Sequence, residues 1–194
     1  MVRMNPYHRE YGLSLGRKMM AWCAKYSIVP APSDSAPSTY EALLAWYTRP
    51  GGIWQRGAIF SIPFPVFSGG CETSIYGSPE ANHAFRAMHD YMHITGRCGF
   101  DLYGEIRTAQ AQERALGCLS AEEQLTFRID SIGQSLLHFL AGGKHLHDQE
   151  AFVTWVYREF NLIANNIDPK LGENYMQTLQ RAVYSYYVNT LGTT

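Results

Sequence analysis

Hydrophobic residues recur at helical spacing along most of the chain. They fall three or four positions apart, and several of these stretches begin with capping signals. The starting signals are Ser38 with Glu41, Ser78 with Pro79, and Ser120 with Glu123. The expected helices cover residues 11–29, 38–47, 78–94, 105–116, 120–140, 148–163 and 175–187. No alternating set of strands and no internal repeat is evident, so the pattern predicts an all-α fold of about six or seven helices, in a single domain over residues 1–194.

Two segments break this helical pattern. Residues 30–38, PAPSDSAPS, have the composition of a linker. Residues 50–79 are rich in proline and glycine, which excludes a long helix, and residues 58–67 carry no charge. This irregular segment is either a lid or wall of an apolar pocket, or a buried connection, and the sequence leaves both open.

Composition narrows the class of protein. Hydrophobic residues make up 46% of the 194 positions, which is ample for a core, and the 13 tyrosines suit either a core or the lining of a pocket for apolar ligands. The net charge of −1, without a long basic run, gives no basis for binding nucleic acid. The four cysteines form no CxxC pair, and no stretch has the roughly 18 apolar residues of a membrane span. We expect a soluble cytoplasmic protein with reduced thiols, for which peripheral contact with a membrane surface remains open.

The strongest chemical signal is His89-Asp90-Tyr91-Met92-His93, which lies inside an expected helix. His89 and His93 are four residues apart and project from one face, one turn from each other. Asp90 lies roughly 100° from His89 around the helix, with His93 between them. Two imidazoles and a carboxylate suit one divalent ion of zinc, iron, manganese or cobalt.

The expected further ligand is Glu105, at the start of the next helix. The loop from Thr95 to Gly104 contains glycines and can reverse the chain, so that Glu105 faces the HDxxH surface. The predicted ligand set is therefore His89, Asp90, His93 and Glu105, with Asp90 and Glu105 also as catalytic candidates. A ligating imidazole needs its other N–H held by a neighbouring group. Candidates for that role are Thr108, Gln112, Asp130 and Gln134.

A purely structural explanation competes with the metal site. An HDxxH pattern also arises by chance, and His89 and Asp90 can form a surface ion pair on a helix. The glutamate at a plausible further corner favours the metal. His83, His145 and His147 fall off this face or lie in a loop, and we expect them on the surface.

The HDxxH motif, the eleven residues after it and Glu105 resemble the signature of the ubiquinone-biosynthesis proteins that act at the C1 position of the coenzyme Q ring. Arg86 before the motif, Thr95-Gly96 after it and Gly104 before the glutamate agree with that pattern. The resemblance covers about residues 80–113. It implies an all-α, metal-binding homodimer that holds an apolar prenylated substrate and takes part in oxidative decarboxylation. A related pattern occurs in domains of large phage polyvalent proteins.

Three functions follow as hypotheses. The first is a metal-dependent enzyme for oxidative decarboxylation or hydroxylation of a small apolar or aromatic, quinone-like molecule, held between residues 58–67 and the tyrosine-rich last helix. The second is a zinc-dependent hydrolase in which Asp90 acts as the general base in place of the glutamate of HExxH. The third is a non-catalytic, metal-stabilised lipid-binding or scaffold protein, in which the ion has no open position.

Overall fold

The fold is built almost entirely from helices. The computed structural model of the chain describes residues 6–49, 62–143, 146, 148–166 and 174–191. The elements are α1 (Pro6–Lys25), β1 (Ile28–Pro32), α2 (Tyr40–Thr48), β2 (Ile62–Val66), α4 (Pro79–Gly96), α5 (Leu102–Leu116), α6 (Ala121–Arg128), the π-helical turn η1 (Ile129–Gly133), α7 (Gln134–Leu140), α8 (Gln149–Asn166), α9 (Tyr175–Tyr186) and the π-helical turn η3 (Tyr187–Leu191). The predicted all-α class is confirmed: α6, η1 and α7 form one uninterrupted helical run, and the described residues thus contain seven helices.

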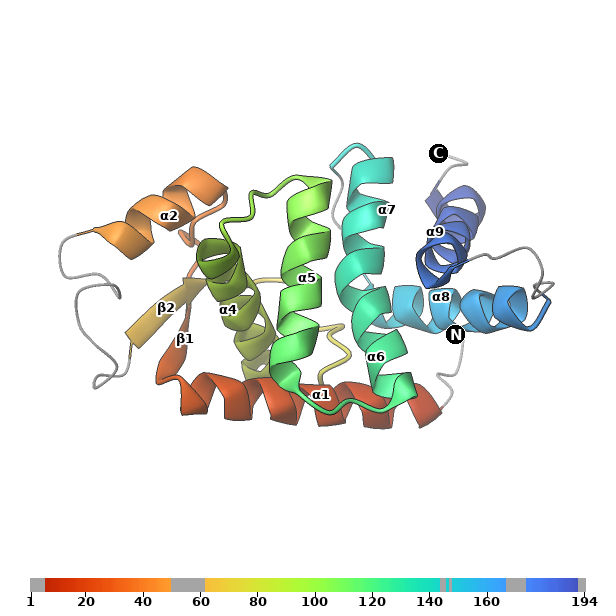
Figure 1. Cartoon of the computed structure of the whole chain (residues 1–194), viewed down its shortest axis with the longest axis horizontal. Helices are drawn as coiled ribbons and strands as arrows, with labels where there is room; N and C mark the ends of the chain where they lie inside the picture. The colour runs from red at the N-terminus through yellow and green to blue at the C-terminus, as the bar shows by residue number, and fades with distance from the viewer. Residues whose placement is uncertain (1–5, 50–61, 144–145, 147, 167–173, 192–194) are drawn as a thin grey trace.

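The long helix α1 forms a base on which the central helices stand. In Figure 1, α4, α5 and the rod of α6, η1 and α7 rise side by side from α1. The pair α8 and α9 packs at the end of the row beside η1, while α2, β1 and β2 lie at the opposite end, against α4. This arrangement puts α4 and α5 next to each other in the middle of the molecule, and these are the two helices that carry the predicted metal ligands.

The two short strands were not expected from the sequence. β1 and β2 pair in parallel, with Ile28 opposite Ile62 and Pro32 opposite Val66. The segments predicted as a linker (30–38) and as irregular chain (50–79) therefore each contain part of a sheet, and residues 50–61 of the irregular segment lie outside the described chain. The strands were not predicted because each contains alternating prolines, and proline has no N–H to donate to the hydrogen bonds between strands. In a two-stranded sheet, however, each strand keeps one unpaired edge where proline is tolerated.

Several helix boundaries differ from the predicted ones. α1 runs from Pro6 to Lys25, because Ser27 has a left-handed backbone conformation (φ 56°) and the chain then enters β1. The cap of α2 is Thr39 and not Ser38, and its side chain accepts from the backbone N–H of Ala42. α5 begins at Leu102, three residues before the predicted start, because Asp101 caps it.

The predicted helix starts at Ser78 and Ser120 are confirmed. The Ser78 side chain accepts the backbone N–H of Ala81 at the start of α4, with Pro79 in the first turn. Ser120 and Glu123 form the predicted capping box of α6. Glu123 has a second role, since its carboxylate also accepts from Lys18 (2.7 Å) and Ser14 (2.7 Å), which joins α6 to the α1 base. The sequence also predicts a break at Asp168-Pro169, before the last helix, and these two residues lie outside the described chain.

Hydropathy along the described helices gives no candidate for a transmembrane element. None of these helices is both long and apolar enough to cross a bilayer.

Candidate metal centre

Two helices supply three ligand atoms to one point. His89 and His93 lie one turn apart on α4, and Glu105 lies in the first turn of α5. His89 Nε2 is 3.1 Å from His93 Nε2 and 3.0 Å from a Glu105 carboxylate oxygen, and His93 Nε2 is 3.4 Å from the other oxygen. Tetrahedral ligands bound at about 2.0–2.1 Å would lie roughly 3.3 Å apart. The spacing is that of a cluster that can hold a metal ion.

A close contact between two glycines places Glu105. Asp101 caps α5 by accepting the backbone N–H of Gly104 (2.9 Å), which sets the first turn of the helix. A Cβ atom on Gly104 would overlap the backbone of Gly99, including its carbonyl oxygen. Glycine at position 104 therefore lets the connecting loop lie directly against α5, so that Glu105 reaches the imidazoles of α4.

The hydrogen bonds of His93 fix which of its nitrogens carries the proton. His93 is fully buried, and its Nδ1 lies 2.9 Å from the backbone carbonyl of Cys98. A carbonyl only accepts, so Nδ1 carries the hydrogen and, in the neutral ring, Nε2 presents a lone pair. Thr108 Oγ1 also lies 3.2 Å from His93 Nδ1.

The same argument applies to His89. Its Nδ1 lies 3.0 Å from Gln112 Oε1, and Gln112 Nε2 donates to the backbone carbonyl of Phe85 (3.1 Å). The bond to Phe85 assigns the nitrogen of the amide, so the oxygen faces His89 and the proton of neutral His89 lies on Nδ1. Gln112 is itself fully buried, which leaves little freedom for another arrangement.

Both neutral imidazoles therefore direct lone pairs at each other and at a carboxylate. Three electron-rich atoms within 3.0–3.4 Å repel one another unless a cation lies among them. A proton on one imidazole ring can relieve this repulsion in part. A divalent metal ion can accept a lone pair from all three atoms at once. In metal sites the second ring nitrogen is held in this way by a carbonyl or carboxylate.

The electrostatics of Glu105 and His89 agree with this arrangement. Burial alone would raise the pKa of Glu105, but the hydrogen bonds and charges of His89 and His93 outweigh it and lower that pKa to about 2. Burial lowers the pKa of His89, but Glu105, Asp90 and Gln112 together more than offset this, so that the net shift is upward. The carboxylate is thus ionised at neutral pH, as a metal ligand must be.

Asp90 lies beside the cluster and does not belong to the described group of converging ligand atoms. Its side chain is partly buried, and burial raises its pKa to about 6, against the opposing effect of His89 and His93. The structure thus brings together three of the four predicted ligands. Asp90 lies close enough to interact electrostatically with all three.

The four residues predicted to hold the imidazoles divide into two pairs. Thr108 and Gln112 contact the rings directly, as described above. Asp130 and Gln134 instead bond to each other, and Asp130 also accepts from the hydroxyl of Tyr76 at 2.6 Å. Asp130 lies in the π-helical turn η1, and burial raises its pKa to about 6, against the hydrogen bonds of Tyr76 and Gln134. This second polar group is linked to the cluster through stacked rings.

Aromatic rings connect and enclose the two groups. The ring of Tyr76 stacks on Phe85 at 5.1 Å, and Phe85 stacks on His89 at 5.7 Å. Phe100, from the loop before α5, packs edge-on against His93 at 4.6 Å. Sequence analysis did not identify Phe85, Phe100 or the carbonyl of Cys98 as part of the site. A backbone carbonyl has no signature in the sequence, although two aromatic residues flanking the motif residues were a usable signal.

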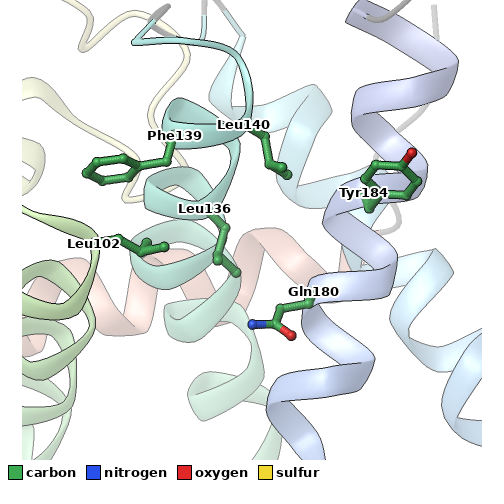
Figure 2. A pocket seen from close by; sticks show the side chains of 6 residues that line it. All are labelled: Leu102, Leu136, Phe139, Leu140, Gln180 and Tyr184. Atoms are coloured by element: carbon green, nitrogen blue, oxygen red, sulfur yellow. The ribbon is translucent and has the colours of Figure 1, made fainter.

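An apolar groove lies between α5, α7 and α9. It has a volume of about 360 Å³, and Figure 2 shows the side chains of these three helices that line it. These are Leu102, Leu136, Phe139, Leu140, Gln180 and Tyr184. Leu102 precedes the ligand Glu105 by one turn of α5. The last helix, α9, contributes Gln180 and Tyr184 to this groove, whereas β2 does not line it; residues 58–61 of the predicted pocket wall lie outside the described chain.

No protein-family profile, no curated protein and no solved structure matches this chain. The resemblance to the coenzyme Q biosynthesis proteins stays a prediction based on the motif.

Proposed function

We propose that the protein is a metal-dependent enzyme that acts on a small apolar or aromatic, quinone-like molecule, by oxidative decarboxylation or hydroxylation. The observation that carries the proposal is the pair of Nε2 lone pairs that converge with the Glu105 carboxylate. Three protein ligands leave positions at the ion for substrate or water, whereas a structural zinc site uses four protein ligands. A two-histidine, one-carboxylate set is also the donor set of non-haem iron oxygenases.

The chemistry of the donors fits a borderline divalent ion, with zinc, iron, manganese and cobalt as the candidates. When bound to His89, His93 and Glu105, the ion would supply Lewis-acid or redox chemistry at its open positions. Gln112 and the Cys98 carbonyl orient the two imidazoles, and Phe85 and Phe100 keep water from their ring faces. Asp90, beside the ligands, is left for proton transfer to or from the substrate.

The groove supports an apolar substrate. Five of its six lining side chains are hydrophobic or aromatic, and Gln180 supplies one polar group, which is typical of small-molecule sites. Leu102 in the groove and Glu105 at the cluster are one turn apart on α5, so the groove and the ligands share this helix. Peripheral membrane contact, a cytoplasmic location and a homodimer remain part of this proposal as predictions.

A zinc hydrolase is the second candidate, and one observation favours it. HExxH hydrolases also bind zinc through two histidines and a glutamate. A further acidic residue, outside the ligand set, is their general base, and Asp90 has the corresponding place beside His89, His93 and Glu105. Asp90 is one methylene shorter than glutamate, so it must approach a bound water more closely to act in this way.

Turnover of defined substrates after metal reconstitution separates these functions. Protein loaded with Fe(II), Mn(II), Co(II) or Zn(II) would be given a phenolic ring acid with an apolar tail, and carbon dioxide release and oxygen uptake would be followed. We expect turnover in the native chain, none in His93→Ala, and a raised KM in Leu140→Lys, with Leu44→Lys on α2 as the control. Ester or peptide hydrolysis with Zn(II) alone would support the hydrolase, and metal binding without any turnover would contradict both enzymes.

A further inference from the structure

A buried carboxylate lies close to the metal cluster without touching it. Asp130, in the π-helical turn η1, is 3% exposed. Within the described part of the chain, both groups that donate to this carboxylate are neutral, namely the Tyr76 hydroxyl and the Gln134 amide. A carboxylate removed from water without a cation in contact with it costs free energy. The cations nearest to Asp130 therefore decide how it is tolerated.

The strongest charge partners of Asp130 lie on α4. They are Arg86 and His89, whereas α8 and α9 present the apolar side chains of Phe152 and Val183 to the same turn. Arg86 already donates to two backbone carbonyls of the loop before α4. A cation held at His89 is thus the remaining source of positive charge for this carboxylate.

The charges around the cluster match a divalent ion. The strongest interactions there involve three carboxylates, those of Glu105, Asp90 and Asp130, and one guanidinium, that of Arg86. The pKa values of the three acids are about 2, about 6 and about 6, so all are ionised at pH 8. With both imidazoles neutral, the carboxylates exceed Arg86 by two negative charges, and one divalent cation offsets this excess.

A stack of rings holds Asp130 and His89 in a fixed relation. The hydrogen bond to Asp130 orients Tyr76, whose ring is inclined by 29° to Phe85, and Phe85 is inclined by 27° to His89. Phe127 packs edge-on against Phe85 at 6.4 Å. The field of the carboxylate therefore acts on His89 across aromatic rings, which screen charge much less than water does.

We infer that Asp130 is an outer carboxylate of the metal centre, which stabilises the ion without ligating it and is kept in place by Tyr76 and Phe85. This inference rests on the metal site of the proposed function. The sequence suggested that Asp130 holds an imidazole directly, and the structure places it one ring stack away. Outer partners of metal ligands typically contribute about 10–100-fold to affinity, and we expect the lower end for a group that touches no ligand.

Asp130→Asn tests the charge with little change in shape. The asparagine oxygen can still accept from Tyr76, and Gln134 can turn its amide to accept from the new N–H. Competition with a chelator would measure the Co(II) and Zn(II) affinities of the full chain at pH 8 and pH 5. We expect about tenfold weaker binding by the variant at pH 8. At pH 5 the native carboxylate is largely protonated before metal binds, so the difference should shrink to about twofold.

Ser131→Ala is the matched control in the same turn. It removes a buried hydroxyl that donates to the Phe127 carbonyl, but it changes no charge, and we expect native affinity at both pH values. Circular dichroism shows whether the variants are folded. Equal affinities of Asp130→Asn and Ser131→Ala at pH 8 would overturn the inference, and so would a loss of the same size at both pH values, which indicates a packing effect. A native chain that binds neither ion would instead overturn the proposed function, and this inference with it.

Discussion

The Nε2 atoms of His89 and His93 lie 3.1 Å apart, and the Nδ1 of each ring is held by an acceptor oxygen. Neither ring can relieve the contact by moving its proton to Nε2 without breaking a buried hydrogen bond, which costs about 1–3 kcal/mol. The protein thus maintains two aligned lone pairs next to a carboxylate. The predictions below follow from this geometry and from the packing that supports it.

Gln112 positions His89, and its removal should weaken metal binding. In Gln112→Leu the N–H of His89 loses its acceptor while the side-chain volume is nearly kept. Loss of such a contact to a metal-bound histidine typically weakens metal affinity about 10–100-fold, and we expect that range here. Isothermal titration with Zn(II) or Co(II) measures it. Gln110→Leu, at an exposed position of the same helix, is the control, and equal affinities for the two variants would contradict the role of Gln112.

Gly104 should be required for both stability and the metal site. Alanine at this position would overlap the backbone of Gly99, so the loop and α5 must separate. Overpacking of this kind costs about 1–3 kcal/mol in the free energy of unfolding, and Glu105 moves with the helix. Urea unfolding and metal titration measure the two effects. Gly99→Ala is the matched control, because its Cβ meets only the Asp101 carboxylate at 3.4 Å, and a Gly104→Ala protein as stable as this control would refute the packing argument.

Asp130 should make stability depend on pH. Burial raises its pKa from 3.8 to about 6, so the folded state binds more protons than the unfolded state between these values. Stability therefore falls as pH rises from 4 to 6, by about 2 kcal/mol from this group. Asp130→Asn should remove that contribution. Urea unfolding of the metal-free proteins across pH 4–7 tests the sign, and a constant difference between the two curves would show that Asp130 does not titrate in this range.

Much of the site could be predicted from the sequence because it depends on local geometry. Two histidines four residues apart on a helix must share a face, and Ser78 with Pro79 identified that helix. Glu105 followed from a loop rich in glycine, although the contact of Gly104 with Gly99 that places it is a tertiary feature.

The features that sequence analysis missed depend on how separate elements pack. An angular offset of roughly 100° allowed Asp90 to join the cluster, but its short side chain and the position of α5 leave it beside the ligands. The Cys98 carbonyl and the Phe85 carbonyl act through backbone atoms, which any residue type can supply. The two strands were masked by prolines at alternate positions, which are tolerated only because the sheet has two edges.

Metal content of the purified chain tests the central claim most directly. The protein would be prepared without a polyhistidine tag, equilibrated with Zn(II) or Fe(II), freed of excess ion and analysed by elemental mass spectrometry. The geometry predicts about one ion per chain in the native protein and in Asp90→Asn, and loss of most of it in His93→Ala and Glu105→Gln. A full metal load in His93→Ala, with its fold intact, would contradict the proposed centre.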